Sequence, residues 1–248
     1  MLSKSAAVRK LGERTGFEWR SREVSRVESL SDAVFGLAVT LLIVSAEVPK
    51  TYEELLSSLR LFVPFAFSFV ILMSIWYQHY IFHRRYGLED LASTIYTMAL
   101  LFLVLFYTYP LKFMFMVDLG TRGYELQSAQ ELAGLFTIYG VGFIAIYVLF
   151  FFMYRHAYRK REELNLTEVE VWDTRHSMRE ILMMGSVGCL SVAVANLLPG
   201  DLVILAGPAY ALLGLISWLH GSWSNKRRAA IFVRLEAAAE EPEPALNV

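Results

Sequence analysis

Long apolar runs, separated by short polar segments, dominate the pattern of the chain. They cover residues 29–46, 59–82, 91–115, 133–154, 181–198 and 202–219. A helix needs roughly 20 apolar residues to cross the hydrocarbon core of a bilayer, and these runs lack the alternation of a barrel strand. Because lipid cannot satisfy backbone polar groups, such runs form helices. The pattern predicts an all-α polytopic membrane protein with six transmembrane helices.

Two connections carry local signals of their own. The fifth and sixth runs are separated by little more than Pro199 and Gly200, which end a helix, and Asp201, which caps the next one. Residues 50–61 precede the second run, and their apolar positions fall near helical spacing: Tyr52, Leu55, Leu56 and Leu59. This second segment predicts a short interfacial helix.

Composition supports a membrane protein. Hydrophobic residues make up 56% of the chain and charged residues 19%, and a soluble chain of this size cannot bury so much apolar surface. Cys189 is the single cysteine, so no intrachain disulfide forms and a packing role is expected. The basic and polar start is unlike a cleavable signal peptide, and the acidic tail 237–248 predicts disorder.

Basic residues gather on alternate connections. They are Arg9, Lys10, Arg14, Arg20, Arg22 and Arg26 before the first run, Arg84 and Arg85 after the second, Arg155, Arg159, Lys160 and Arg161 after the fourth, and Lys226, Arg227, Arg228 and Arg234 after the sixth. The positive-inside rule then places both termini in the cytoplasm, which agrees with an even number of spans. We expect a cytoplasmic segment 1–27, a membrane domain 28–222 and a cytoplasmic tail 223–248.

Polar residues inside an apolar helix are costly and are therefore candidates for function. Ser31 and Asp32 lie near the start of the first run, shortly after Arg26. One interpretation is a carboxylate that the helix dipole favours at an amino-terminal turn. The other is a defined polar network. The residues alone leave both open.

An apolar stripe continues along the same run. Leu37, Leu41 and Val44 are spaced by four and three, so they share a helix face. This spacing is typical of a lipid-facing or packing stripe, but also fits a hydrophobic constriction formed by several copies of the helix. Gly36 and Thr40 form a pair of small residues, which favours close helix packing.

The start of this run resembles a known signature. Arg26, Leu30, Ser31 and Asp32 are similar to the first-helix motif R-x-x-x-F-S-D of the transmembrane protein 175 family of potassium channels, with Leu30 at the position where the family usually has Phe. The motif occurs once here. The resemblance therefore implies a homotetramer of the prokaryotic type around a central pore in the cell membrane, with six spans per subunit.

The resemblance also implies a function and its residues. It implies a passive, potassium-preferring cation channel in which Leu37 forms the narrowest apolar ring, Leu41 and Val44 form deeper rings, and Thr40 lies beside them. No carbonyl filter of the T-V-G-Y-G type occurs in the sequence. Potassium is the expected permeant ion, and no cofactor or nucleic acid is expected.

The second run contributes the other implied site residues. In the family, a Trp and a His on the second helix hold the signature, so Trp76 and His79 are candidates to bond Ser31 or Asp32. An aromatic belt at the membrane interface is the alternative. His79 and His83 also have the spacing of metal ligands on a helix. No third ligand is evident, so no metal site is predicted.

Rival function classes find less support. A membrane enzyme would need convergent catalytic groups, yet the chain lacks H-E-x-x-H and G-x-S-x-G. A proton- or ion-coupled transporter would typically show internal repeats or helices broken within the membrane, and neither is evident in the sequence. A structural membrane protein without conduction stays open.

Overall fold

Over the described residues, the regular secondary structure is entirely helical. A computed structural model describes residues 17–21, 23–44, 50–60, 62–118, 126, 128–198, 200–214 and 216. Its α-helices are α2 (Arg26–Val44), α3 (Tyr52–Arg60), α4 (Phe62–Tyr86), α5 (Leu91–Asp118), α6 (Ala129–Arg159) and α7 (Glu168–Leu197), followed by the 3₁₀ helices η1 (Gly200–Ala206) and η2 (Pro208–Ala211). Over these residues the all-α prediction is confirmed.

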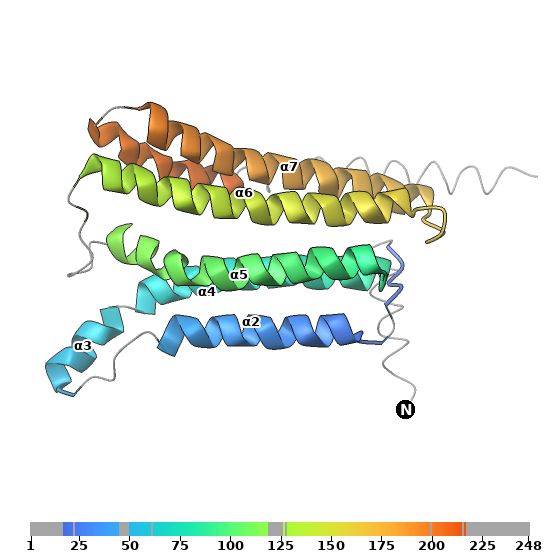
Figure 1. The fold of residues 1–248 in the computed structure, drawn as a ribbon, viewed down its shortest axis with the longest axis horizontal. Helices are drawn as coiled ribbons and strands as arrows, with labels where there is room; N and C mark the ends of the chain where they lie inside the picture. Colours follow the sequence, from blue (N-terminus) through green and yellow to red (C-terminus); the bar gives the residue numbers. More distant parts are fainter. Residues whose placement is uncertain are drawn as a thin grey trace, which may run out of the picture.

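The long helices run side by side (Figure 1). α2 packs against α4 and α5, α5 packs against α6, and α6 packs against α7. α3 projects from the bundle at the end opposite the start of α2 (Figure 1). The predicted short helix within residues 50–61 is therefore present, while its place at a membrane interface stays a prediction.

α7 begins well before the fifth apolar run, at Glu168 instead of residue 181. Thr167 and Glu170 explain the early start, because each side chain accepts a hydrogen bond from the backbone N–H of the other in a capping box. The first turns of α7 are polar but packed, with Val169 and Thr174 buried. A prediction based on the length of apolar runs misses such a polar extension of a helix.

The sixth apolar run differs from the expected α-helix. Residues 200–211 form 3₁₀ turns, in which the Gly207 N–H donates to Ile204 O and the Tyr210 N–H to Gly207 O. Pro208 supplies a physical reason, because proline has no N–H to donate to an α-helical ladder and its ring crowds the preceding turn. The break between the fifth and sixth runs is confirmed.

Four of the described helices are long and apolar enough to cross a membrane. They are Phe65–Tyr86, Leu91–Thr108, Ala129–Arg159 and Glu168–Leu197. The first predicted run corresponds to α2, and the sixth to the apolar stretch Leu202–Gly214, which is shorter. The structure thus supports four spans directly, and the count of six stays a prediction.

Close backbone approach joins α6 to α7. A Cβ atom on Gly140 would lie 2.3 Å from Val192 Cγ2, and one on Gly188 would lie 2.9 Å from Ile144 Cγ1. Small residues let membrane helices approach closely where lipid offers no hydrophobic driving force between helices. These glycines therefore set the spacing of the two longest helices.

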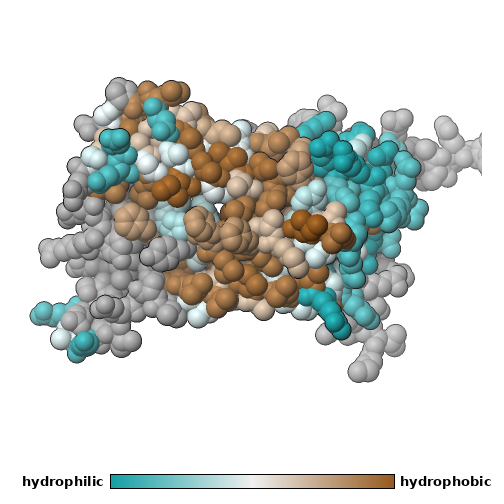
Figure 2. Space-filling view, in the orientation of Figure 1, coloured by the Kyte–Doolittle hydropathy of each residue, from teal (hydrophilic) through white to brown (hydrophobic). Residues whose placement is uncertain are grey.

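The two ends of the bundle differ in polarity (Figure 2). We call the end where α2, α5 and α7 begin the basic end. Its described basic residues are Arg20, Arg26, Arg84, Arg85, Arg155, Arg159, Lys160, Arg161, Arg175 and Arg179. An apolar surface covers the middle of the bundle, and hydrophilic residues gather at the basic end (Figure 2). Segment 1–16, Arg22, the tail 223–248 and the side chain of Val44 lie outside the described residues.

Candidate functional site

α2 presents two different faces. Phe35, Ala38 and Leu42 are buried against the rest of the subunit, with the spacing of three and four that marks one side of a helix. Leu37 and Leu41 lie on the other side, and Leu37 is 52% exposed. The predicted stripe therefore lies on a face that the described subunit leaves uncovered.

The remaining predicted pore residues fall on the same stretch. Thr40 is exposed, and its hydroxyl donates a 2.9 Å hydrogen bond to Gly36 O of its own helix. Val44 is the last residue of α2. A Cβ atom on Gly36 would meet no described atom within 4 Å. The predicted close packing at Gly36 and Thr40 therefore has no counterpart within the described subunit.

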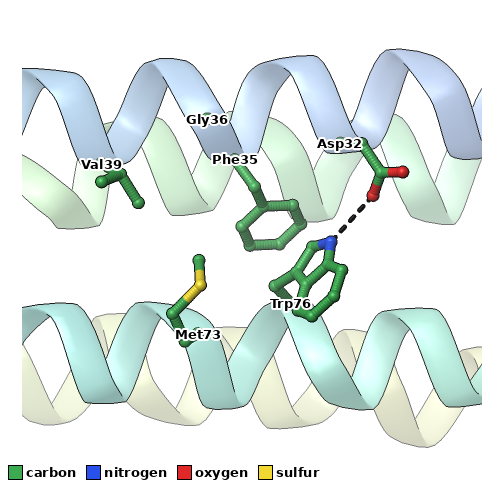
Figure 3. A pocket seen from close by; sticks show the side chains of 6 residues that line it. All are labelled: Asp32, Phe35, Gly36, Val39, Met73 and Trp76. Carbon is green, nitrogen blue, oxygen red and sulfur yellow. Dashed lines mark hydrogen bonds between the residues drawn. The ribbon is translucent and has the colours of Figure 1, made fainter.

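A groove of about 320 Å³ lies beside Gly36, between α2 and α4 (Figure 3). Its lining is mostly apolar and consists of Asp32, Phe35, Gly36, Val39, Met73 and Trp76. One hydrogen bond crosses it: the indole N–H of Trp76 donates to Asp32 Oδ1 at 2.8 Å. The structure therefore joins two of the predicted network residues directly.

Trp76 is the first of three stacked side chains along one face of α4. Its ring stacks on Tyr80 with centroids 5.6 Å apart, and the Arg84 guanidinium lies 5.4 Å from the Tyr80 centroid. These three positions are one helical turn apart, which places their side chains on one face. Asp32 is thereby connected along α4 to the basic end.

Ser31 and Arg26 do not join Trp76 or His79. Ser31 is fully buried, and its hydroxyl donates to Val27 O at 2.7 Å, within its own helix. Arg26 is exposed at the first residue of α2. Among the described residues, no hydrogen bond links Arg26 to Ser31 or Asp32. The expected bonds of Ser31 to α4 are therefore not seen.

His79 approaches α2 through an aromatic contact. The His79 ring is buried, with its centroid 6.1 Å from that of Phe35 and 4.4 Å from that of His83. His83 Nε2 lies 3.3 Å from Thr97 Oγ1 on α5. In the described residues, His79 Nε2 has no hydrogen-bond partner. The predicted bond from His79 to Ser31 or Asp32 is thus replaced by packing against Phe35.

The described part of the chain contains no arrangement of side chains suited to bind a metal ion. Over those residues, no group of three or more His, Cys, Asp or Glu side chains is arranged to hold an ion. The pair His79 and His83 therefore has two potential donors and no third within this region.

Sequence reasoning missed a capping box at the start of α2. The Glu28 N–H donates to Ser25 Oγ at 3.1 Å, and the Ser25 N–H donates to Glu28 Oε1 at 3.4 Å. The motif S-x-x-E was present as a signal. Arg20, used only to orient the chain, pairs with Glu170 at 2.7 Å, and no local sequence pattern indicates that contact.

A second polar cluster lies at the basic end, between α5 and α6. Asp90 Oδ2 is 2.6 Å from His156 Nε2 and 3.1 Å from Lys160 Nζ, and Asp90 Oδ1 accepts from the Ser93 N–H. Partial burial raises the pKa of Asp90, but the bonds from Ser93, His156 and Lys160 outweigh it, so this pKa lies well below its usual range.

Comparison with known proteins identifies a matching family and two related channels. The profile of the family "Endosomal/lysosomal potassium channel TMEM175" matches residues 26–110. A potassium channel of Marivirga tractuosa is 36% identical over 232 residues, which cover 88% of this chain and 94% of the relative. A potassium channel of Chamaesiphon minutus is 28% identical over 146 residues, covering 54% of this chain and 66% of the relative.

Solved structures agree. A threonine-to-alanine variant of the potassium channel MtTMEM175, in complex with a nanobody–MBP fusion protein, superimposes with a TM-score of 0.74 at 36% identity, covering 85% of this chain and 97% of the other. A TMEM175 homolog from Chamaesiphon minutus superimposes with a TM-score of 0.55 at 20% identity, covering 79% and 96%, which shows a shared fold. The membership predicted from the first-helix motif is confirmed: this chain belongs to the TMEM175 family and is a multi-pass membrane protein.

Proposed function

We propose that this protein is a passive, potassium-preferring cation channel of the cell membrane, in which four copies surround a central pore. The relatives named potassium channels support this function, since one of them matches nearly the whole chain at 36% identity. The fold supports it as well, through the likeness to the potassium channel MtTMEM175. Potassium is the permeant ion, and no cofactor takes part.

The two faces of α2 carry the proposal. One face is buried in the subunit, while the opposite face is apolar and uncovered. A helix that is apolar all round needs a second apolar surface or lipid. In a fourfold arrangement the uncovered face turns toward the axis, where Leu37 forms the narrowest ring, with Leu41 and Val44 deeper and Thr40 beside them. Rings of apolar side chains control conduction through dewetting.

The polar network takes a more specific form than the motif alone suggests. Asp32 and Trp76 hold α2 beside α4 through a direct hydrogen bond. Ser31 bonds its own helix at the packed face, and His79 supports Phe35. Arg26 starts the helix. These residues fix the position of α2 and leave the choice of ion to the apolar face.

Orientation follows from charge. The basic end faces the cytoplasm, because Lys and Arg are retained on that side of a membrane. Both termini then lie in the cytoplasm, and the spans number six when α2 and the apolar stretch Leu202–Gly214 are counted with the four long helices.

Potassium flux tests the function. Purified protein in liposomes, with potassium inside, sodium outside and a protonophore that lets protons balance the exported charge, is expected to release potassium down its gradient at neutral pH with no imposed proton gradient. Flux equal to that of empty liposomes refutes the channel. Flux that requires a proton gradient identifies a coupled transporter instead.

A matched pair of leucines tests the constriction. Leu37→Ala is expected to lower the potassium-over-sodium permeability ratio and raise conductance, because a smaller side chain widens an apolar ring. Leu182→Ala on α7 is the control, since Leu182 is 54% exposed and lies on a helix outside the proposed pore. If both variants have the same permeability ratio and conductance, the constriction does not lie at Leu37.

A further inference from the structure

Residues 17–21, which we call the strap, cross the basic end before α2 begins. The Arg20 N–H donates to Arg84 O at 3.1 Å, and Arg84 Nη1 donates to Ser21 O at 3.3 Å. Phe17 is buried, edge-on to Tyr86 with centroids 5.6 Å apart. The strap is therefore packed against the last turns of α4.

Arg20 attaches the strap to α7. Its Nη1 and Nη2 donate to Glu170 Oε1 and Oε2 at 2.9 and 2.7 Å, and its Nε donates to Leu164 O at 2.9 Å. Such a paired guanidinium–carboxylate contact fixes direction as well as distance. Glu170 is only 1% exposed, and it also accepts from the Glu18 N–H. This geometry distinguishes the pair from surface ion pairs, most of which contribute little.

The other end of the strap attaches to α2. The Ser21 hydroxyl lies 2.8 Å from Glu23 O and 3.3 Å from Glu28 Oε1. Glu28 is buried and belongs to the capping box with Ser25 that starts α2. Continuous polar contacts therefore run from the first turn of α7, through Arg20 and Ser21, to the first turn of α2.

We propose that Arg20 and Glu170 form a latch that sets the position of the start of α2 and thereby the open probability of the channel. Arg20 is a positioning residue and does not contact the ion. The inference rests on the proposed channel function. A conducting pore needs the four copies of α2 in equivalent positions, and an unlatched helix end samples several positions.

Trypsin measures latch closure independently of ion flux. The Arg20–Ser21 peptide bond is a trypsin site that the latch protects, because cleavage requires a released arginine. Glu170→Gln removes the charge but keeps a residue that the capping box accepts. We expect cleavage at this bond, followed by mass spectrometry, to be about tenfold faster in Glu170→Gln than in the wild type. Glu162→Gln is the control, because Glu162 is 87% exposed and lies in the connection just before α7.

Flux measures the consequence for the channel. Arg20→Gln and Glu170→Gln are each expected to lower ensemble potassium flux about threefold or more, with unitary conductance and the potassium-over-sodium ratio unchanged. The double variant is expected to match the single ones, because residues in direct contact give non-additive effects. Open probability in single-channel recordings separates the latch from a general loss of stability, because fewer folded channels would lower ensemble flux but leave the open probability of each channel unchanged.

Each outcome decides between the two proposals. Wild-type protein that is cleaved at Arg20 as fast as unfolded protein refutes the latch, even if every variant folds poorly. Normal wild-type flux with normal flux in both variants also refutes the latch, as do additive losses in the double variant. Absent wild-type flux refutes the channel function, while protection at Arg20 still reports the contact.

Discussion

The first turns of α2 and the stretch that follows them are held in different ways. The start has directional contacts: the capping box of Ser25 and Glu28, and the bond from Trp76 to Asp32. The later stretch packs through Phe35, Ala38 and Leu42 on one face only. Directional bonds fix the position of a helix, whereas an uncovered apolar face remains available to ions, lipid or other subunits. We therefore expect mutations in the two regions to have different effects.

Glu170→Ala is expected to have the largest effect on stability. It leaves the partly buried Arg20 without its carboxylate, and breaking a buried pair costs about 3–5 kcal/mol. Thermal unfolding in detergent measures the loss. Glu162→Ala removes an exposed partner of Arg161 and should change stability by less than about 0.5 kcal/mol. Equal shifts in the two variants would mean that the latch does not hold the basic end together.

Two leucines of α2 test the difference between its faces. Leu42 is 2% exposed, so Leu42→Ala should destabilise the subunit by about 2–5 kcal/mol through lost packing and a cavity. Leu37→Ala changes an uncovered position and should alter unfolding by about 0.5 kcal/mol or less. Unfolding temperature and permeability ratio should be measured on both variants. Leu42→Ala should show the larger change in unfolding temperature, and Leu37→Ala the larger change in permeability ratio. A large unfolding shift for Leu37→Ala would place that face in a packed interface.

The bond between α2 and α4 should have an intermediate effect. Trp76→Phe keeps an aromatic ring but removes the donor to Asp32, and hydrogen bonds to charged groups contribute about 1.5–3 kcal/mol, less where water competes. Tyr77→Phe alters an exposed neighbour and serves as the control. Thermal unfolding and single-channel recording together check this variant. Unchanged unfolding in Trp76→Phe would show that packing alone holds α2 at this turn.

Removal of the Asp32 carboxylate tests the same contact from the side of α2. Asp32→Ala is expected to disturb assembly or opening more than ion choice, because Asp32 bonds α4 and does not lie with Leu37 on the apolar face. Chromatography of the solubilised protein and flux measurements test this. A stable assembly with normal conductance would exclude a positioning role for Asp32.

The elements were predictable where burial in lipid dictates them. Apolar runs of sufficient length predicted α4, α5 and α6 closely. They missed the polar start of α7, where the capping box of Thr167 and Glu170 and packed neighbours sustain the helix. They also missed the 3₁₀ turns around Pro208, because apolar length does not report the hydrogen-bonding pattern.

The site was predictable only in part. The family resemblance implied that Trp76 bonds Ser31 or Asp32, and the structure joins Trp76 to Asp32. The partner of Ser31 was not predictable, since a buried serine bonds either its own helix or a neighbour, depending on its rotamer. The pair of Arg20 and Glu170 joins residues separated by 150 positions. Only the packed arrangement of helices brings such residues together.

The smallest expected effect concerns Asp90, the second polar contact of the basic end. Its folded pKa lies below its unfolded value of 3.8, so the carboxylate adds stability above that pH and loses it as the pH falls toward the folded value. Asp90→Asn keeps a residue suited to cap α5 but removes the charge that faces Lys160.

The difference in unfolding temperature between wild type and Asp90→Asn should therefore be present at neutral pH and shrink below about pH 4. It should correspond to about 1 kcal/mol or less, since this pair is partly exposed. Glu89→Gln, at the neighbouring exposed position, should show no such trend. A difference that stays constant over this range would mean that Asp90 acts through its shape as a cap, and that its charge does not help to join α5 to the end of α6.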